Sequence, residues 1–235
     1  MAKENSHRFN FYGRRRGKKI SSLQRNHLDK FLPAITPLGI DYEENPNRKK
    51  ISFIEIFGSD CPVWIEVGFG GGEHLLSIAK ENRDVGFIGC EPYINGVAMF
   101  LPKLLSSNLS NVRVIMDDAR ILFEVVPNSS VSKLFLLFPD PWPKRRHNRR
   151  RFINTESLKT LKRILKSDGL LYVATDVDEY VRHVLEKLCV EKEFEWIADG
   201  PDDWRKPWRG WKSTRYAEKA TSLGKKITYL IFRRI

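Results

Sequence analysis

Short apolar runs alternate with amphipathic stretches from residue 63 to residue 189. The runs predict β-strands over residues 63–67, 86–90, 112–116, 133–138 and 169–174. The intervening stretches keep apolar side chains on one helical face, most clearly over residues 94–105, 158–165 and 177–188. Pro102 falls inside the first of these helices and is expected to kink it or to shift its start. Such alternation is typical of βα units in a mostly parallel sheet.

The alternation ends after Cys189. Residues 194–198 and 227–233 predict two more strands without a full crossover helix between them, so the sheet is expected to finish with an antiparallel pair. The predicted fold is therefore α/β, with a doubly wound, mostly parallel sheet of seven strands. Residues 1–60 lack this pattern and predict a basic arm with one short apolar-sided helix, whereas residues 61–235 form the predicted main domain.

Charge and composition narrow the classes of function. Lys and Arg number 41 against 29 Asp and Glu, which gives a net charge of +12 and favours a polyanionic partner such as nucleic acid. No long uncharged apolar run and no secretory signal are evident, so we expect a cytoplasmic protein without a membrane partner. Three widely spaced cysteines argue against a disulfide framework, a zinc ribbon or an iron–sulfur cluster. No metal is expected.

A glycine-rich loop follows the first predicted strand, in the segment Glu66-Val67-Gly68-Phe69-Gly70-Gly71-Gly72-Glu73. The glycines, Gly68 and Gly70 among them, allow a tight turn and close approach of a ligand to the backbone. A dinucleotide-binding pattern would need glycine in place of Glu73, and the Gly-Lys-Ser/Thr of a P-loop is missing. Glu66 and Glu73 would repel a pyrophosphate, so the loop favours a positively charged cofactor such as S-adenosylmethionine.

Two more strands end in acidic residues. Glu91 stands where an acid in a doubly wound sheet accepts hydrogen bonds from ribose hydroxyls, and Asp118 with Ala119 can reach an adenine edge. Either acid could instead cap the helix that follows it. Together with the glycine loop, they favour a cofactor site at the carboxyl edge of the sheet.

The fourth predicted strand runs into Pro139-Asp140-Pro141-Trp142-Pro143-Lys144, and then into a basic run. The prolines hold Asp140 in a rigid segment beside the predicted cofactor cleft, and Trp142 offers a stacking surface. Such a combination suits a site that modifies a nucleobase. The alternative is a stiff turn followed by a solvated charged surface. The expected RNA contacts are Arg146, His147, Asn148, Arg149, Arg150 and Arg151.

These motifs make the chain resemble the bacterial tRNA (guanine-N7-)-methyltransferases, which are class I S-adenosylmethionine enzymes. The resemblance covers nearly the whole chain, and the Pro-Asp-Pro-Trp-Pro-Lys string is its most specific part. It implies methylation of guanine N7 in the variable loop of tRNA, with S-adenosyl-L-methionine as cofactor. The expected cofactor contacts are Glu66, Gly68, Gly70, Glu91, Asp118, Ala119 and Asp140, with Asp140 as the catalytic acid.

The resemblance also implies tRNA contacts by Lys144, Asp176, Thr214, Arg215, Tyr216 and Ala217. The family usually has Glu where Ala217 stands, and Glu218 comes one place later, so either Glu218 takes that role or the contact is missing. His74 and His183 are interpreted as ordinary helix residues. The sequence leaves a monomer and a homodimer equally open.

Guanine N7 has an in-plane lone pair and no proton to lose, so the reaction needs alignment and electrostatic stabilisation more than a strong base. Asp140 could accept hydrogen bonds from guanine N1–H and the exocyclic amine. Two alternatives stay open: a methyltransferase for an exocyclic amine, whose Asp/Asn-Pro-Pro-aromatic loop is loosely similar, and an RNA-binding protein without catalysis.

Overall fold

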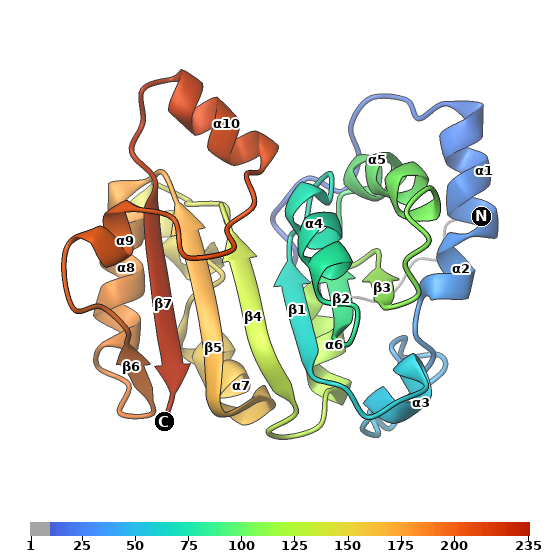
Figure 1. Cartoon of the computed structure of the whole chain (residues 1–235), viewed down its shortest axis with the longest axis horizontal. Helices are drawn as coiled ribbons and strands as arrows, with labels where there is room; N and C mark the ends of the chain where they lie inside the picture. The colour runs from blue at the N-terminus through green and yellow to red at the C-terminus, as the bar shows by residue number, and fades with distance from the viewer. Residues whose placement is uncertain (1–9) are drawn as a thin grey trace.

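The computed structural model describes residues 10–235 as one seven-stranded sheet with helices on both faces (Figure 1). The first nine residues of the predicted arm lie outside the described residues. The strands are β1 Val63–Val67, β2 Gly86–Cys90, β3 Val112–Ile115, β4 Val131–Leu137, β5 Leu165–Thr175, β6 Phe194–Trp196 and β7 Thr228–Arg234. The helices are α1 Ser22–Lys30, α2 Leu32–Ile35, α3 Phe53–Phe57, α4 Glu73–Glu81, α5 Ile94–Leu105, α6 Ala119–Val125, η1 Arg145–Arg150, α7 Thr155–Ile164, α8 Asp178–Leu188, α9 Asp202–Arg205 and α10 Arg215–Ser222.

The strand order β3-β2-β1-β4-β5-β7-β6 confirms the predicted doubly wound class. Strands β1 to β5 are parallel, and β7 is antiparallel to both β5 and β6, which confirms the predicted antiparallel end. The chain turns back across β1 to form β4, so the order reverses between these two strands. Ligands of open α/β sheets bind at such a switch point, beyond the carboxyl ends of the strands.

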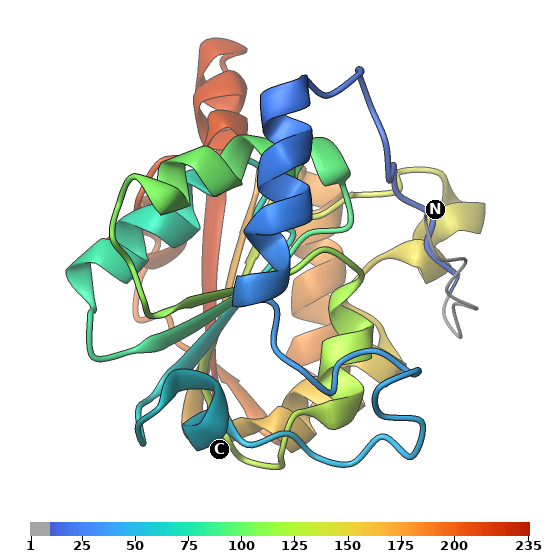
Figure 2. The same cartoon turned by 90° about the vertical axis from the view of Figure 1, so that its right-hand side faces the viewer.

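Each face of the sheet has its own apolar core. One core joins α6, α7 and α8 to the sheet, and the other joins α1, α4 and α5 to the opposite face. Figure 2 shows these two helix layers on either side of the strands. Leu28 and Leu32 from the N-terminal region belong to the second core, where they are buried. The division at residue 60 stays a prediction.

Two details differ from the prediction. Helix α5 begins at Ile94 as expected, but it continues through Pro102 to Leu105. Pro102 removes one backbone donor, whereas Leu101 and Leu104 beside it are buried and hold this last turn against the core. Strand β5 begins at Leu165, directly after α7, which is four residues earlier than predicted.

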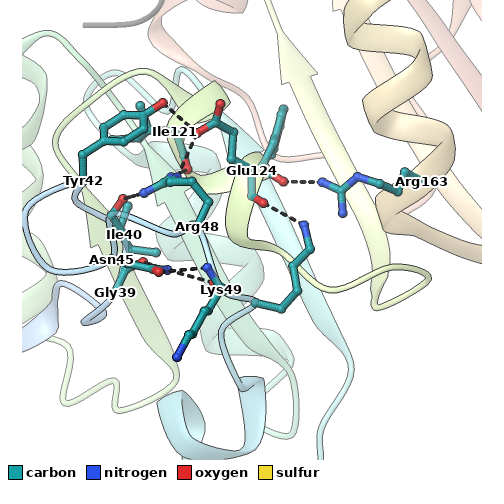
Figure 3. Close-up of polar contacts among 11 residues, drawn as sticks. Gly39, Ile40, Tyr42, Asn45, Arg48, Lys49, Ile121, Glu124 and Arg163 are labelled. Carbon is teal, nitrogen blue, oxygen red and sulfur yellow. Dashed lines mark hydrogen bonds and ion pairs between the residues drawn. The ribbon is translucent and has the colours of Figure 1, made fainter. Parts of the chain in front are cut away.

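The segment before α3 is fastened to the C-terminal end of α6 (Figure 3). Arg48 donates to the Ile121 carbonyl at 2.5 Å and to the Glu124 carboxylate at 2.9 Å, and Lys50 donates to the Glu124 carbonyl at 2.7 Å. Arg163 reaches the same helix end from α7 by donating to the Val126 carbonyl at 2.8 Å. Cations at the negative end of a helix dipole stabilise it. The network therefore fixes α6, whose other end reaches the carboxyl edge of the sheet.

Within the described residues, no helix is long and apolar enough to cross a membrane.

Candidate active site

A cavity of about 1260 Å³ lies at the carboxyl edge of the sheet. It is called the cleft below. Its walls include the glycine loop, the ends of β2 and β3, the segment after β4, the chain before α1, one side of α7 and Tyr216 of α10. The wall residues used below are Tyr12, Gly68, Gly70, Glu91, Asp118, Ala119, Asp140, Trp142, Arg149, Arg150 and Tyr216. The structure therefore brings most of the predicted cofactor contacts together with Asp140.

The glycine loop turns the chain from β1 into α4. Gly68 and Gly70 have φ of 73° and 56°, in the left-handed region that a branched side chain avoids. The carbonyl of Gly70 lies so close to Gly96 that a Cβ at Gly96 would be 2.7 Å from it. The loop thus lies tightly against the first turn of α5, with its backbone exposed to the cleft.

Glu91 holds this loop in place. Its carboxylate accepts hydrogen bonds from the Gly70 N–H at 2.6 Å and from the Tyr93 N–H at 2.9 Å. Glu91 is buried, and burial raises the pKa of its carboxyl above the ordinary value of 4.5. The two N–H donors oppose this rise, and the nearby charges of Glu66 and Asp140 add to it.

Asp118 does cap the following helix, as the alternative interpretation held. Its carboxylate accepts from the Arg120 backbone N–H at 3.0 Å and pairs with the Arg120 guanidinium at 2.6 Å. It also lines the cleft, next to the buried Ala119. Asp118 can both cap α6 and line the cleft, because α6 begins at the cleft.

Glu66 and Glu73 do not face the cleft as the charge argument expected. The Glu66 carboxylate is buried and lies 2.7 Å from Nδ1 of His74, while Glu73 pairs with Lys103 at 2.9 Å. Both acids therefore have cationic or histidine partners within the protein. The cofactor contact of Glu66 stays a prediction, and His74 lies on helix α4, as expected, where it forms a buried pair with Glu66.

The segment around Asp140 has an unusual backbone. Phe138 and Trp142, on either side of it, have φ of 50° and 41°, a region that non-glycine residues rarely adopt. The Phe138 N–H is fixed by the Ala174 carbonyl at 2.7 Å. Asp140 itself is exposed toward the cleft, where partial loss of hydration raises the pKa of its carboxyl. Backbone strain of this kind is concentrated at functional sites.

The basic run after Trp142 divides into exposed and buried members. Arg149 and Arg150 line the cleft, and Lys144, Arg145 and Arg146 are exposed. Desolvation lowers the pKa of His147, and the charges of the neighbouring cations lower it further.

Arg151 is different, because its side chain is turned into the protein, and its RNA contact stays a prediction. Its side chain is 2% exposed, donates to the Pro141 carbonyl at 2.8 Å, and pairs with Glu179 at 2.6 Å. It fastens the proline-rich segment from behind instead of meeting solvent.

Helix α10 brings Tyr216 to the cleft. Tyr216 is 61% exposed, and its ring stacks on Phe138 with an interplanar angle of 20°. Thr214 and Ala217 face inward instead, and the Thr214 hydroxyl caps the helix by accepting from the Ala217 N–H at 3.0 Å. Ala217 is buried and carries no carboxylate, so its tRNA contact stays a prediction that its position does not support. Glu218 is exposed.

Asp176 lies outside the cleft, in a neighbouring cavity of about 190 Å³ that it shares with Tyr216. Its carboxylate pairs with Lys225 at 2.7 Å. Residues 10–235 contain no group of three or more His, Cys, Asp or Glu that could hold a metal ion.

Sequence reasoning missed the part of the cleft wall that comes from the chain before α1. Residues 10–14, including Tyr12, line the cleft together with Asp140. The aromatic pair before the arginines was a usable signal, because Phe11 and Tyr12 interrupt an otherwise polar segment.

Comparison with known proteins relates the chain to methyltransferases. A family model described as "Putative methyltransferase" matches residues 60–230. A tRNA (guanine-N(7)-)-methyltransferase from Ruegeria sp. is 51% identical over 96% of this chain and 88% of its own length. The protein of the same name from Roseobacter denitrificans is 47% identical over the full length of both chains. The chain belongs to this family.

Solved structures with lower identity share the fold of this tRNA (guanine-N(7)-)-methyltransferase family member. An antibiotic-related methyltransferase superposes with a TM-score of 0.53 at 16% identity, over 80% of this chain and 98% of its own. The 16S rRNA methyltransferase KamB gives 0.53 at 12% identity, over 77% and 92% of the two chains. Both likenesses show the fold alone.

S-adenosyl-L-methionine is the cofactor of the chain, and the cleft fits it. The left-handed glycines expose backbone to a ligand, and the buried Glu91 offers carboxylate oxygens near the glycine loop. The cavity also has room for a nucleoside with a second base beside it.

Proposed function

We propose that the chain transfers a methyl group from S-adenosyl-L-methionine to N7 of a guanine in the variable loop of tRNA. The observation that carries the proposal is the position of Asp140. It lines one cleft together with Gly68 and Gly70 of the glycine loop and with the cations Arg149 and Arg150. A fixed carboxylate between a cofactor site and a phosphate-binding surface is what methylation of a base in RNA requires.

The cofactor side of the cleft binds and orients the methyl donor. Gly68 and Gly70 allow close approach to the backbone, and Glu91 accepts hydrogen bonds from ribose hydroxyls. Asp118 and Ala119 meet the adenine from the start of α6. When bound, the cofactor supplies an electrophilic methyl group on a positively charged sulfur.

Asp140 acts on the base. Guanine N7 carries a lone pair and no proton, so no residue has to remove one before the attack. A carboxylate that accepts from guanine N1–H and the exocyclic amine fixes the base and stabilises the positive charge that develops on it. The prolines and the two left-handed residues beside Asp140 hold this carboxylate in one place.

The RNA side of the cleft binds phosphates without reading sequence. Arg149 and Arg150 line the cleft, and the run continues outward through exposed cations. We assign further tRNA contacts to Lys144, Arg146, His147, Asn148, Arg215 and Tyr216. Asp176 and Thr214 support this surface from beside and beneath it.

The residues assigned to the site are compatible with a monomer or a homodimer. The substrate places the enzyme in the cytoplasm.

The decisive test locates the methyl group. The chain is incubated with unmodified tRNA and tritium-labelled S-adenosylmethionine, and the product is reduced and treated with aniline. We expect cleavage of the RNA at one guanine in the variable loop, because reduced 7-methylguanosine is labile to aniline. Label on an exocyclic amine would favour the alternative methyltransferase. Cofactor and tRNA binding without transfer would favour an RNA-binding protein.

A further inference from the structure

The chain before α1 forms a fixed strap across the mouth of the cleft. The Asn10 carbonyl accepts from Arg120 at 3.0 Å, and Arg15 pairs with Asp117 at 3.1 Å. Just beyond, the Gly17 N–H donates to the Asn95 side chain at 2.8 Å. Figure 2 shows this blue segment running beside the yellow segment that contains η1. Because these contacts lie on both sides of Tyr12, its position is set by the fold.

Tyr12 meets two residues of the opposite wall. Its ring lies 6.3 Å from the Trp142 ring in an edge-to-face arrangement, and the Arg150 guanidinium lies 4.4 Å from the Tyr12 centroid. Arg150 is also 4.9 Å from the Trp142 centroid. The three side chains form one cluster at the cleft mouth, called the aromatic cluster below.

The cluster has unused binding capacity. Nε of Arg150 is buried and has no hydrogen-bond partner, and its guanidinium lies against the Tyr12 and Trp142 rings rather than against a carboxylate of residues 10–235. Tyr12 is nevertheless 41% exposed, so its ring is accessible from the cleft. An aromatic face that is open to solvent and a guanidinium without a carboxylate partner among the described residues match the two parts of a nucleotide, its base and its phosphate.

We propose that Tyr12 stacks on the target guanine while Arg150 donates to a phosphate of the same strand. This inference rests on the proposed function and extends it, because it names a base-holding residue outside the methyltransferase core. Trp142 supports both side chains and carries a strained backbone beside Asp140. Stacking would hold the guanine plane while Asp140 holds its edge, which together fix the direction of N7.

Three variants of the full-length chain test the inference: Tyr12→Ala, Tyr12→Phe and, as a control, Phe31→Ala. Phe31 is an exposed aromatic of the same N-terminal region whose ring contacts His27 away from the cleft. We expect Tyr12→Ala to lower kcat/KM for tRNA by about tenfold, since base stacking contributes about that much. Tyr12→Phe should stay within about twofold, because stacking needs the ring and not the hydroxyl. Phe31→Ala should also stay within about twofold, because Phe31 does not line the cleft.

Two further measurements distinguish stacking of Tyr12 on the base from a structural role of Tyr12 in holding the strap. The affinity for S-adenosylmethionine should be unchanged in Tyr12→Ala. In complexes with tRNA that carries 2-aminopurine at the target position, wild type and Tyr12→Phe should quench its fluorescence more than Tyr12→Ala does. Equal quenching by all three, or a parallel loss of cofactor affinity and thermal stability in Tyr12→Ala, would overturn the inference. If wild type itself did not methylate N7, the proposed function would fail instead.

Discussion

The two walls of the cleft are built on different principles. On the cofactor wall, the glycine loop and Glu91 are held by short hydrogen bonds to buried groups. On the RNA wall, Arg149 and the exposed cations before it make few contacts within the protein. One wall therefore depends on exact backbone geometry, and the other on the number of charges. A single substitution should abolish the function of the first wall and only weaken that of the second.

Backbone strain follows the same division. On the cofactor wall, the residues with a left-handed backbone conformation are glycines, which adopt it at little energetic cost. On the RNA wall, the left-handed residues are Phe138 and Trp142, and this conformation costs about 1–3 kcal/mol at each of them. That cost is acceptable where it fixes Asp140 beside the base.

The largest effect is expected from Gly70→Val. No side chain would clash with a Cβ at Gly70, but its φ of 56° excludes a branched residue, so the loop must change shape. We expect calorimetry to show a loss of S-adenosylmethionine affinity of at least about 100-fold, as for a backbone that no longer fits its ligand.

Gly58→Val is the matched control, because Gly58 has φ of 75° with open space around it at the end of α3. It should cost stability without weakening cofactor binding. Equal losses of affinity in both variants would show that the glycine loop is not the binding element.

The next effect concerns the RNA wall. Neutralising Arg149 and Arg150 with glutamine should weaken binding to every tRNA by roughly tenfold and reduce the slope of log K against log salt by about 1.5. Lys206→Gln is the control, since this exposed lysine pairs with Asp202 on another surface. An unchanged slope in the double variant would mean that Arg149 and Arg150 do not contact phosphates of the tRNA.

A smaller effect, the pH dependence of cofactor affinity, distinguishes the cofactor wall from the RNA wall. The raised pKa of Glu91 means that it takes up a proton at a higher pH than an ordinary glutamate and then loses an acceptor for the ribose. Affinity for S-adenosylmethionine should therefore fall several-fold as the pH is lowered from 7 toward 5, before tRNA binding weakens. Glu91→Gln should bind more weakly but show little pH dependence. A full pH dependence in that variant would assign the titration to another group.

The smallest functional effect is expected at Arg151. Its removal leaves the Pro141 carbonyl without its donor, so Arg151→Ala should lower the free energy of unfolding by about 1–3 kcal/mol. The salt dependence of tRNA binding should not change, unlike that of the Arg149 and Arg150 double variant. Denaturant unfolding and salt titration of this variant therefore compare a buried and an exposed arginine of one run. A reduced salt slope would place Arg151 among the phosphate contacts after all.

The sequence predicts the sheet and the cofactor wall well because both depend on local patterns. Apolar runs of strand length identify β1 to β5, and glycines after β1 indicate a turn that other residues cannot make. The carboxyl edge then follows from the rule for open α/β sheets, which places Glu91 and Asp118 together with Asp140.

What the sequence could not predict depends on long-range packing. Arg149 and Arg151 look alike in a basic run, and only the position of Pro141 and Glu179 makes one of them structural. The buried pair of Glu66 and His74 likewise depends on how α4 packs on the sheet. The strap is a third case, because no periodicity places Tyr12 beside Trp142.

The most direct test of the central claim compares rate with affinity at Asp140. Single-turnover methyl transfer at saturating tRNA and cofactor is measured for wild type and Asp140→Ala, together with the Kd for tRNA. We expect the variant to lose about 100-fold or more in rate, because it lacks the group that balances charge in the transition state. Its tRNA affinity should stay within a few-fold of wild type, since phosphate contacts supply most of the binding. Near-normal transfer by Asp140→Ala would show that Asp140 is not the catalytic residue.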